Sequence, residues 1–392
     1  MLRSSSICMS FLYNYLTSES ETNDKMGDFG KKCQKLKCLA KTFGSYGGVL
    51  SKLSQILSLS NENSEVFSDC KPFSKEKTIN YLKKHCPDSL KNVDYTVYKS
   101  GSVGQVHKAT YKNKKVIIKV QYVGLKKQTI SDLNILDKMA SYIYYFADMK
   151  TVMVDIKTKM NEELDYTLEA ESQKLIYKIY KNDPYIEIPK VIKKLSTDKM
   201  ICMNYIEGRS LTDFINNSTQ TEKNAFGMCI IKFIFQTLYK HSILYSDIHY
   251  GNLLVKNDNT LSVLDFGCIH KIEDSLLNNM KKLHKSLIDK DKDTFYKLVE
   301  DIGIINKDIS EKSKKYIYDY FLIQYTPWIE EEFEFTDEWL EMCSMKEVEL
   351  MKEWVLPQNM VYFNKIPYGS YHIFTKLKLK GRFKDIIDAV LN

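Results

Sequence analysis

The sequence predicts an α+β fold in which a small β-rich lobe is followed by a larger helical lobe. Between residues 95 and 120, β-rich runs alternate with glycines and with a turn centred on Asn113, a pattern typical of an antiparallel meander. From Leu211 onward the apolar residues recur mainly at helical spacing. The same spacing in residues 31–60 indicates that extra helices precede the β-rich lobe.

The first 90 residues are expected to form two segments. Residues 1–30 are interpreted as a disordered or a targeting segment, because Met1–Ser18 contains Arg3, several serines and no acidic residue. Residues 31–90 are expected to form a helical extension, and its last helix spans Lys75–His85.

Residues 91–205 are expected to form the β-rich lobe. Helical spacing returns in 125–148 and 150–181, so the lobe also contains helices. Its strands are expected at Tyr95–Tyr98, Gln105–Ala109, Val116–Val120, Ile188–Val191 and Met200–Tyr205.

Residues 206–392 are expected to form the helical lobe and a helical tail. Two short strands are expected within it, at Asn252–Val255 and Leu261–Leu264. In the tail, aromatic residues are interleaved in the acidic segment Glu330–Glu341, which predicts an amphipathic surface helix. A lid or a partner site is the alternative interpretation of this segment.

The composition is that of a globular protein. The chain has 392 residues, of which 44% are hydrophobic and 27% charged, enough for one large two-lobed core or two domains. Lys and Arg number 57 against 50 Asp and Glu, and the basic residues are spread along the chain. We therefore expect no nucleic-acid partner, and interpret the basic runs as solvated helix faces. Weak peripheral contact with a phosphate-rich membrane surface is the alternative.

The nine cysteines are scattered without a C-x-x-C pair, which fits a reducing intracellular compartment. No run of about 18 apolar residues occurs, so no membrane-spanning helix is expected. The sequence leaves the compartment unknown, and mitochondrial import is an alternative that rests on the N-terminal segment alone.

A glycine-containing loop lies within the predicted meander. It matches the kinase pattern G-x-G-x-x-G-x-V at Gly101, Gly104 and Val106, with Lys99 in place of the first glycine. Glycines let the backbone approach a phosphate closely, and Ser102 could donate its hydroxyl to a phosphate oxygen. An ordinary turn between strands is the alternative interpretation.

A lysine and an acidic helix follow this loop. Val116–Lys119 resembles the strand V-A-I-K, which directs its lysine at the α- and β-phosphates of a nucleotide. Such a lysine needs a carboxylate partner. The predicted helix Glu162–Glu169 offers four, and Asp165 and Glu169 share one helical face. An exposed strand end and an acidic surface helix are the alternatives.

The most specific pattern is Asp247 followed five residues later by Asn252, and then Asp265-Phe266-Gly267 after a short strand pair. This spacing is that of the kinase motifs H-R-D-x-x-x-x-N and D-F-G. In that pattern Asp247 orients the acceptor hydroxyl and takes its proton, whereas Asn252 and Asp265 hold the Mg²⁺ that bridges the phosphates of ATP. His249 is expected either to contact phosphate or to pack against its surroundings.

Several motifs resemble those of the UbiB family of atypical kinases, the aarF-domain or ADCK-type proteins linked to coenzyme Q biosynthesis. The family motifs K-x-G-Q, A-A-A-S-I-G-Q-V-H, V-K-V-Q-x-P-G, E-x-D-Y-x-x-E-A and D-x-H-P-G-N correspond to Lys52–Gln55, Lys99–His107, Ile118–Gly124, Glu163–Ala170 and Asp247–Asn252. The resemblance covers residues 43–301. It implies a bilobal protein-kinase-like fold with extra N-terminal helices.

The resemblance also implies regulatory and catalytic roles. Glu169 would be the partner of Lys119, and the helix that contains Lys52 and Gln55 would fold over the active site. Lys52 would then meet the carboxylates of the E-x-D motif, which are Glu163 and Asp165. A closed site of this kind leaves little room for a protein substrate.

The chain departs from the family pattern in several motifs. Val123 and Tyr250 replace prolines, which is expected to affect rigidity only. Ser54 replaces the glycine of K-x-G-Q, and Lys99–Gly101 replaces three alanines. These changes are expected to affect helix packing, nucleotide preference or autoinhibition. No required catalytic residue is missing.

Together these residues predict an ATP- and Mg²⁺-dependent kinase or ATPase of UbiB type that acts on a small or lipid-like substrate, or that supports isoprenoid-quinone lipid metabolism. One alternative is a small-molecule kinase of the aminoglycoside or choline-kinase type, which shares the D-x-H-x-G-N loop but lacks the Lys52–Gln55 and Glu163–Ala170 motifs. The other is a nucleotide-binding scaffold with little turnover.

Overall fold

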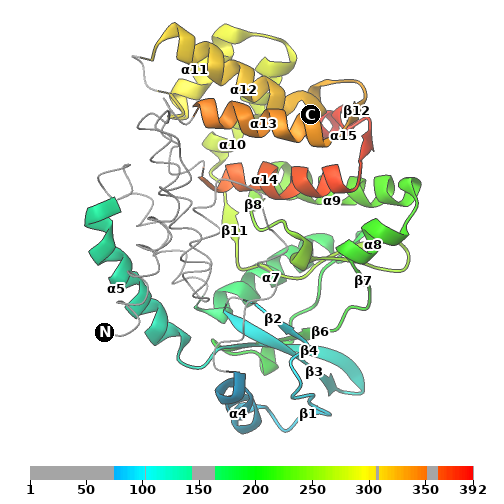
Figure 1. Ribbon diagram of the computed structural model, residues 1–392. Helices are drawn as coiled ribbons and strands as arrows, with labels where there is room; N and C mark the ends of the chain where they lie inside the picture. The colour runs from blue at the N-terminus through cyan, green and yellow to red at the C-terminus, as the bar shows by residue number, and fades with distance from the viewer. Residues whose placement is uncertain (1–74, 102, 144–163, 306–308, 351–360, 392) are drawn as a thin grey trace, which may run out of the picture. The chain divides into compact units, whose positions relative to one another are not determined.

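The computed structural model divides the chain into two compact units. Unit 1 comprises Met1–Leu175 and Pro189–Tyr205, and unit 2 comprises Ile176–Ile188 and Ile206–Asn392. The residues that the structure describes are 75–101, 103–143, 164–305, 309–350 and 361–391. The α+β fold class is confirmed, because an antiparallel sheet organises unit 1 and helices dominate unit 2 (Figure 1).

Unit 1 is built on a five-stranded sheet in which the main strand order is β1-β3-β4-β6, with β2 paired to β3. Its described elements are α4 (Lys75–His85), β1 (Leu90–Lys91), β2 (Lys99–Ser100), β3 (Gly104–Tyr111), β4 (Lys114–Gln121), α5 (Leu125–Ile143), the first part of α7 (Tyr166–Tyr180), the 3-10 turn η1 (Lys193–Leu195) and β6 (Met200–Asn204).

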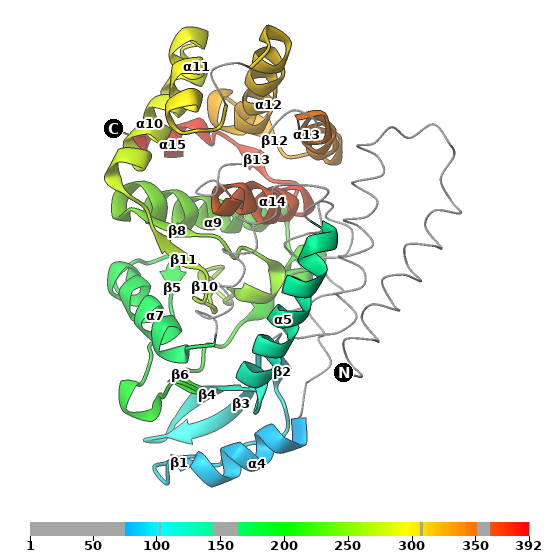
Figure 2. The ribbon, with the colours of Figure 1, turned by 90° about the vertical axis from the view of Figure 1, so that its left-hand side faces the viewer.

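The centre of this sheet is the β3–β4 hairpin. Its two-residue turn consists of Lys112 and Asn113, whose φ angles are 48° and 60°. Both lie in the left-handed region, as a tight hairpin turn requires. One face of the hairpin carries Val116 and Ile118, which are buried against Leu82 of α4. Figure 2 shows α4 alongside the sheet, so this helix covers one of its faces.

The predicted strand at Tyr95–Tyr98 is wrong, since the paired segment is β2 at Lys99–Ser100. The backbone N–H groups of Asp94 and Tyr98 bond the carbonyls of Lys108 and Val106. From Asp94 to Tyr98 the chain advances by four residues, whereas the facing stretch of β3, from Lys108 to Val106, advances by only two. The longer stretch therefore bulges away from the sheet. Thr96 N–H donates to the Asp94 side chain at 2.8 Å, which stabilises this bulge.

Unit 2 contains a four-stranded sheet in the order β5-β10-β9-β7, a two-stranded pair β8–β11, and a second pair β12–β13. Its strands are β5 (Ile186–Glu187), β7 (Arg209–Ser210), β8 (Ile243–Tyr245), β9 (Leu253–Val255), β10 (Leu261–Val263), β11 (Ile269–Lys271), β12 (Phe333–Glu334) and β13 (Lys380–Gly381). Its helices are α8 (Leu211–Asn217), α9 (Gln220–His241), the 3-10 turn η2 (Tyr250–Asn252), α10 (Asp274–Ile288), α11 (Lys292–Asp301), α12 (Glu311–Ile329), α13 (Asp337–Leu350), α14 (Val361–Lys376) and α15 (Lys384–Leu391).

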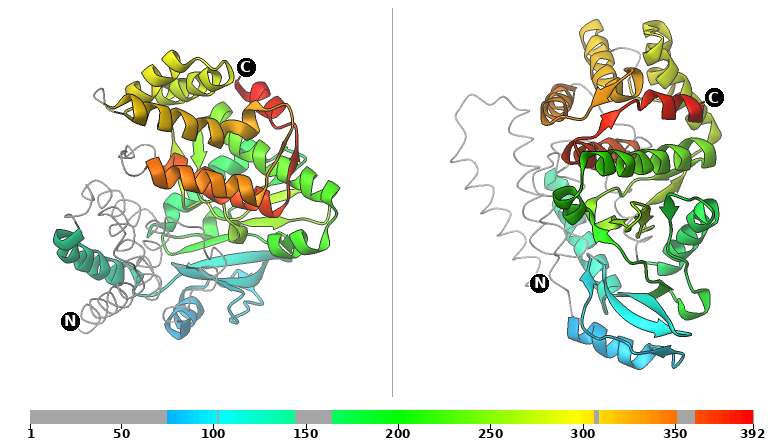
Figure 3. Two further views of the ribbon diagram at one scale, coloured as in Figure 1. Left: turned by 45° about the horizontal axis from the view of Figure 1, so that its top comes forward. Right: turned by 90° about the vertical axis from the view of Figure 1, so that its right-hand side faces the viewer.

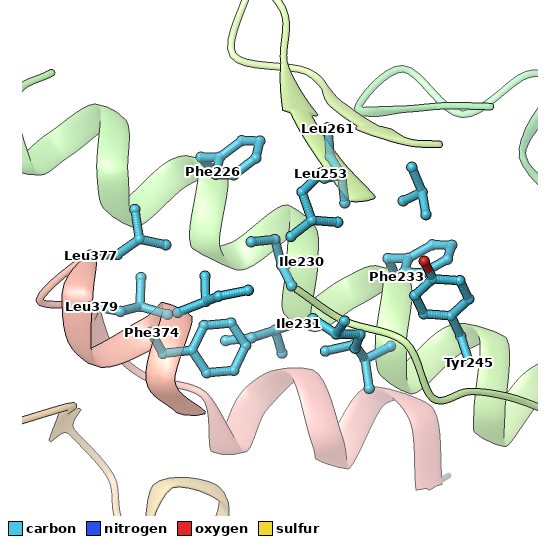
Figure 4. Packing of buried hydrophobic residues seen from close by; sticks show 14 of the residues in the cluster. Phe226, Ile230, Ile231, Phe233, Tyr245, Leu253, Leu261, Phe374, Leu377 and Leu379 are labelled. Carbon is cyan, nitrogen blue, oxygen red and sulfur yellow. The ribbon is translucent and has the colours of Figure 1, made fainter. Parts of the chain in front are cut away.

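Helix α9 is the central helix of unit 2. It begins with a capping box, in which Thr219 and Glu222 satisfy each other's backbone N–H groups. It ends at Ser242, whose φ of 54° lies in the left-handed region. Two buried residues of this helix, Ile230 and Phe233, belong to one apolar cluster with Phe374, which α14 contributes (Figure 4). Figure 3 shows α10, α11 and α12 grouped at one end of the unit.

The tail does not form the surface helix predicted for Glu330–Glu341. Phe333–Glu334 is strand β12, which pairs with β13, and the helix that follows begins at Asp337. Phe335 and Trp339 are 1% and 6% exposed in the main core of unit 2. Phe335 and Trp339 are therefore core residues. The backbone of Phe335 bonds the Leu379 carbonyl next to the strand pair, and Trp339 is on α13.

Several predicted features lie outside the described residues. These are the helices of residues 31–60, the domain segment 1–30, the motif Lys52–Gln55, and the two side chains Ser102 and Glu163. None of the described helices is both long and apolar enough to cross a membrane.

Candidate nucleotide site

Lys119 and Glu169 form a short ion pair in unit 1. Lys119 Nζ lies 2.6 Å from Glu169 Oε1, and the two side chains are 15% and 7% exposed. Lys119 is on β4 and Glu169 is in the first turn of α7. A pair this short and this well shielded from water fixes the direction of the lysine side chain.

The start of α7 is attached to the sheet by two hydrogen bonds. Gln121 Nε2 donates to the Leu164 carbonyl at 3.0 Å, and Tyr166 N–H donates to the Asp198 carbonyl at 3.0 Å. The Tyr166 ring is buried, and Lys119 Nζ lies 5.2 Å from its centroid. The lysine is therefore held by a carboxylate and a ring face. Sequence reasoning assigned no role to Tyr166, although it is the tyrosine of the E-x-D-Y-x-x-E-A motif.

Asp165 caps helix α7. Its Oδ1 accepts a hydrogen bond from the backbone N–H of Thr167 at 2.8 Å. An aspartate that accepts from the second residue of a helix stabilises the helix N-terminus. The predicted regulatory contact of Asp165 with Lys52 stays a prediction, because Lys52, Gln55 and Glu163 lie outside the described residues.

The two glycines of the loop differ in what surrounds them. Gly101 N–H donates to the Gly104 carbonyl at 2.9 Å, and among the described residues the nearest atom to a Cβ on Gly101 would be the Gly104 carbonyl oxygen, at 3.8 Å. A Cβ on Gly104 would lie 2.5 Å from both the Tyr166 hydroxyl and the Val120 carbonyl oxygen. Gly104 is therefore required by the packing of α7 on the sheet. Val106, the third predicted loop residue, is the register partner of Lys119.

In unit 2, Asp247 and Asn252 are held together at the two ends of one loop. Asn252 Nδ2 donates to the Asp247 carbonyl at 3.0 Å and to Asp247 Oδ2 at 2.9 Å. Asn252 is 7% exposed, whereas 30% of the Asp247 side chain is exposed. The carboxylate at the start of the loop is therefore accessible, and the amide at its end fixes its orientation.

His249 stabilises the same loop from within. Its Nδ1 accepts a hydrogen bond from Gly251 N–H at 3.0 Å, and its Nε2 lies 3.6 Å from Asp247 Oδ2. Because Nδ1 accepts, the proton of the neutral ring is on Nε2, facing the aspartate. The ring thus has a structural role, while 49% of its side chain is exposed.

Asp265 is positioned by its own turn and by Tyr245. Gly267 N–H donates to Asp265 Oδ1 at 3.0 Å, and the intervening Phe266 is buried. The Tyr245 hydroxyl donates to the Asp265 carbonyl at 3.0 Å. Burial raises the pKa of Tyr245 well above its usual value, and the carboxylates of Asp247 and Asp265 raise it further. Tyr245 therefore remains a neutral donor.

Sequence reasoning missed Tyr245. The available signal was its position at the end of a short apolar strand, two residues before Asp247. Nothing in the local pattern distinguishes it from an ordinary core tyrosine.

The oxygen atoms of Asn252 and Asp265 suit a hard cation such as Mg²⁺. Within the described residues, no group of three or more His, Cys, Asp or Glu side chains is arranged to hold a metal. Magnesium needs no such group when it binds with a nucleotide, since phosphate oxygens and waters complete its coordination. The oxygen atoms of the Asn252 and Asp265 side chains are therefore compatible with nucleotide-bound Mg²⁺.

The chain is similar to a known protein family and to several known proteins. The family model of the ABC1 atypical kinase-like domain matches residues 65–299. The chain is 23% identical over 322 residues to Atypical kinase COQ8, mitochondrial, of Saccharomyces cerevisiae, covering 76% of this chain and 64% of COQ8. It is 28% identical over 244 residues to Probable serine/threonine-protein kinase abkB of Dictyostelium discoideum, covering 57% of this chain and 36% of abkB.

A third relative is Protein ACTIVITY OF BC1 COMPLEX KINASE 8, chloroplastic, of Arabidopsis thaliana. It is 23% identical over 257 residues, which are 62% of this chain and 34% of that protein. The chain thus spans roughly a third of the length of the plant and Dictyostelium relatives.

A solved structure has the same fold. Rv3197 of Mycobacterium tuberculosis, determined in complex with erythromycin, matches with a TM-score of 0.67 and 21% identity. The match covers 88% of this chain and 93% of Rv3197. Because the family model matches more than half of the sequence, and the fold agrees, the chain belongs to the ABC1/UbiB (aarF-domain) family of atypical kinases.

Proposed function

We propose that this protein is an ATP- and Mg²⁺-dependent atypical kinase or ATPase that acts on a small or lipid-like molecule. The observation that carries the proposal is the 2.6 Å ion pair between Lys119 and Glu169. In protein kinases the corresponding lysine–glutamate pair must be in place for the nucleotide phosphates to be positioned. Membership of a kinase-like family supports nucleotide binding in general terms.

Each predicted site residue has a role in this proposal. In unit 1, Lys119 would contact the α- and β-phosphates, Glu169 would hold Lys119, and the loop Gly101–Gly104 would lie along the phosphates. Val106 would contact the nucleotide base.

In unit 2, Asn252 and Asp265 would hold Mg²⁺, which when bound neutralises the charge that develops on the transferred phosphoryl group. Asp247 would orient the acceptor hydroxyl and accept its proton. The hydrogen bonds from Asn252 to Asp247 support this role, because they hold the Asp247 carboxylate in one orientation at the start of the loop.

The acceptor is proposed to be small or lipid-like rather than a protein. The family resemblance links the chain to isoprenoid-quinone lipid metabolism, and one relative is named Atypical kinase COQ8. The solved neighbour Rv3197 was determined with erythromycin, which is also a small molecule. Peripheral contact with a membrane would bring the protein to a lipid-like acceptor. The aminoglycoside or choline-kinase type is disfavoured, because the chain matches the ABC1 family model.

The test is the thermal stability of wild type and Asp265→Ala with and without Mg²⁺-ATP. A ligand present at about a hundred times its dissociation constant stabilises the folded state by about 2.7 kcal/mol, which a melting curve resolves. We expect a Mg²⁺-dependent rise in the melting temperature of wild type that Asp265→Ala loses. The matched control is Asp289→Ala, which removes an exposed carboxylate at the end of α10 and keeps the rise.

A folded wild type without any Mg²⁺-dependent rise would contradict the proposal. A rise without ADP formation, in the presence of candidate lipid acceptors, would favour the nucleotide-binding scaffold instead.

A further inference from the structure

Helix α14 touches the Asp247–Asn252 loop at a place where only glycine fits. A Cβ built on Gly369 would overlap the carbonyl oxygen of Ile248 and would lie 3.1 Å from its carbonyl carbon. Real Cβ atoms essentially never come as close to a neighbour as the first contact, and the second is tighter than most of their contacts. Any other residue at 369 must therefore push the helix or the loop, and Ile248 directly follows Asp247.

A second contact joins the same two segments. The His372 ring on α14 meets the Tyr250 ring edge-on, with 6.2 Å between centroids. Ile248 and the α14 residue Phe374 are buried in the same apolar cluster. The loop residues that α14 contacts, Ile248 and Tyr250, lie between Asp247 and Asn252.

The sequence of α14 is unfavourable for a helix at this contact. Pro367 lies inside the helix and removes one backbone hydrogen bond, and Gly369 costs about 1 kcal/mol relative to alanine. Ser370 donates its hydroxyl back to the Ile366 carbonyl at 2.6 Å, a bond that tends to bend helices. Residues that disfavour the secondary structure in which they lie are expected where that segment serves a functional site.

Another helical glycine in unit 2 provides a comparison. A Cβ on Gly227 of α9 would lie 2.5 Å from the end of the Leu379 side chain. A leucine side chain can rotate away, whereas a backbone carbonyl moves only with its neighbours in the chain. Both glycines are crowded, but the neighbour of Gly227 is a flexible side chain, whereas the neighbour of Gly369 is the backbone of the Asp247–Asn252 loop.

We propose that Gly369 is a positioning residue, through which α14 fixes the Asp247–Asn252 loop for binding of nucleotide-bound Mg²⁺. The inference rests on the proposed function of that loop. A larger residue at 369 displaces the Ile248 carbonyl, and with it the Asp247 and Asn252 side chains that flank it. A shift of about 1 Å in such groups reduces activity on the order of a hundredfold.

The experiment compares Gly369→Ala with Gly227→Ala in the full chain. The first measurement is the affinity for a fluorescent ATP analogue with Mg²⁺ and with EDTA. For Gly369→Ala we expect the gain in affinity that Mg²⁺ provides to fall by about tenfold or more, with the affinity in EDTA unchanged. Gly227→Ala should keep the wild-type gain even where its melting temperature falls by the same amount.

The second measurement is hydrogen–deuterium exchange in residues 247–253. The backbone N–H groups of Gly251 and Asn252 both bond His249 within the loop. Gly369→Ala should speed exchange of this peptide relative to the core of unit 2, whereas Gly227→Ala should not. A milder variant, His372→Ala, should show the same change at smaller size if Gly369→Ala does not fold.

The outcomes separate the two proposals. A wild type without any Mg²⁺-dependent gain overturns the proposed function, and the exchange of residues 247–253 still decides whether Gly369 fixes the loop. Equal exchange and equal Mg²⁺ gain in wild type and Gly369→Ala overturn the role of Gly369.

Discussion

The two groups of site residues are held in place by different means. In unit 1, Lys119 is held by a side-chain ion pair with Glu169 and lies near the Tyr166 ring. In unit 2, Asp247 and Asp265 are held through the backbone, by hydrogen bonds to the Asp247 and Asp265 carbonyls and by bonds within each turn.

This difference determines how each group responds to substitution. Loss of one partner of a shielded ion pair leaves the other charge without compensation, so the fold of unit 1 should suffer. Loss of one hydrogen bond among several leaves the loop in unit 2 folded but less well ordered, so binding should suffer more than stability. The following predictions test this contrast.

The largest effect is expected for Glu169→Gln. It removes the carboxylate that pairs with the Lys119 ammonium at 2.6 Å in a place shielded from water, which costs about 3 kcal/mol of unfolding free energy. Urea denaturation measures this loss. The control is Glu171→Gln on the same helix, whose ion pair with Lys174 is also 2.6 Å long but whose side chain is 65% exposed. That change should cost less than about 1 kcal/mol. Equal losses of unfolding free energy in the two variants would contradict the role of shielding from water.

An intermediate effect is expected for Gly104→Ala. The new methyl group would collide with the Tyr166 hydroxyl and the Val120 carbonyl, and overpacking of this kind costs about 1–3 kcal/mol. Gly101→Ala, in the same loop, has room for its methyl group and should change stability by less than about 0.5 kcal/mol. Thermal melts of the two variants decide the matter. A Gly104→Ala protein as stable as wild type would show that the close contacts of Gly104 with Tyr166 and Val120 do not require glycine.

The smallest change in stability is expected for Tyr245→Phe. It removes one buried hydrogen bond, to the Asp265 carbonyl, at a cost of about 1 kcal/mol. Tyr180→Phe is the matched control, because it removes a buried hydroxyl that bonds Thr237 instead. Both variants should melt slightly earlier than wild type. Only Tyr245→Phe should weaken the stabilisation by Mg²⁺-ATP, and equal weakening in both would remove the role assigned to Tyr245.

The sequence predicted correctly those turns and strands that depend only on neighbouring residues. The hairpin turn at Lys112–Asn113 and the strand that ends near Lys119 were found because turn chemistry and β-rich runs act over a few residues. The pairing of Lys119 with Glu169 was implied by the family resemblance and is observed, although the catalytic roles of both residues stay predictions.

Features that depend on distant parts of the chain were missed. The aromatic residues near Phe335 were assigned to the surface because their partner strand, β13, lies more than forty residues later. Tyr166 and Tyr245 resemble ordinary core tyrosines in sequence, and only tertiary contacts show what their hydroxyls and rings face. Gly369 is missed for the same reason, because a backbone-to-backbone contact leaves no periodic signal.

The apolar cluster of unit 2 has a consequence for synthesis of the protein. It joins Ile176 and Ile186 to Phe383 and Ile387, so that the first and last parts of the unit pack together. A ribosome adds about 5–20 residues per second, and the Asp247–Asn252 loop is therefore made on the order of ten seconds before the helices that pack beside it. During that interval the apolar strands around the loop lack these packing partners, and slow decoding of the codons for residues 253–376 would lengthen it.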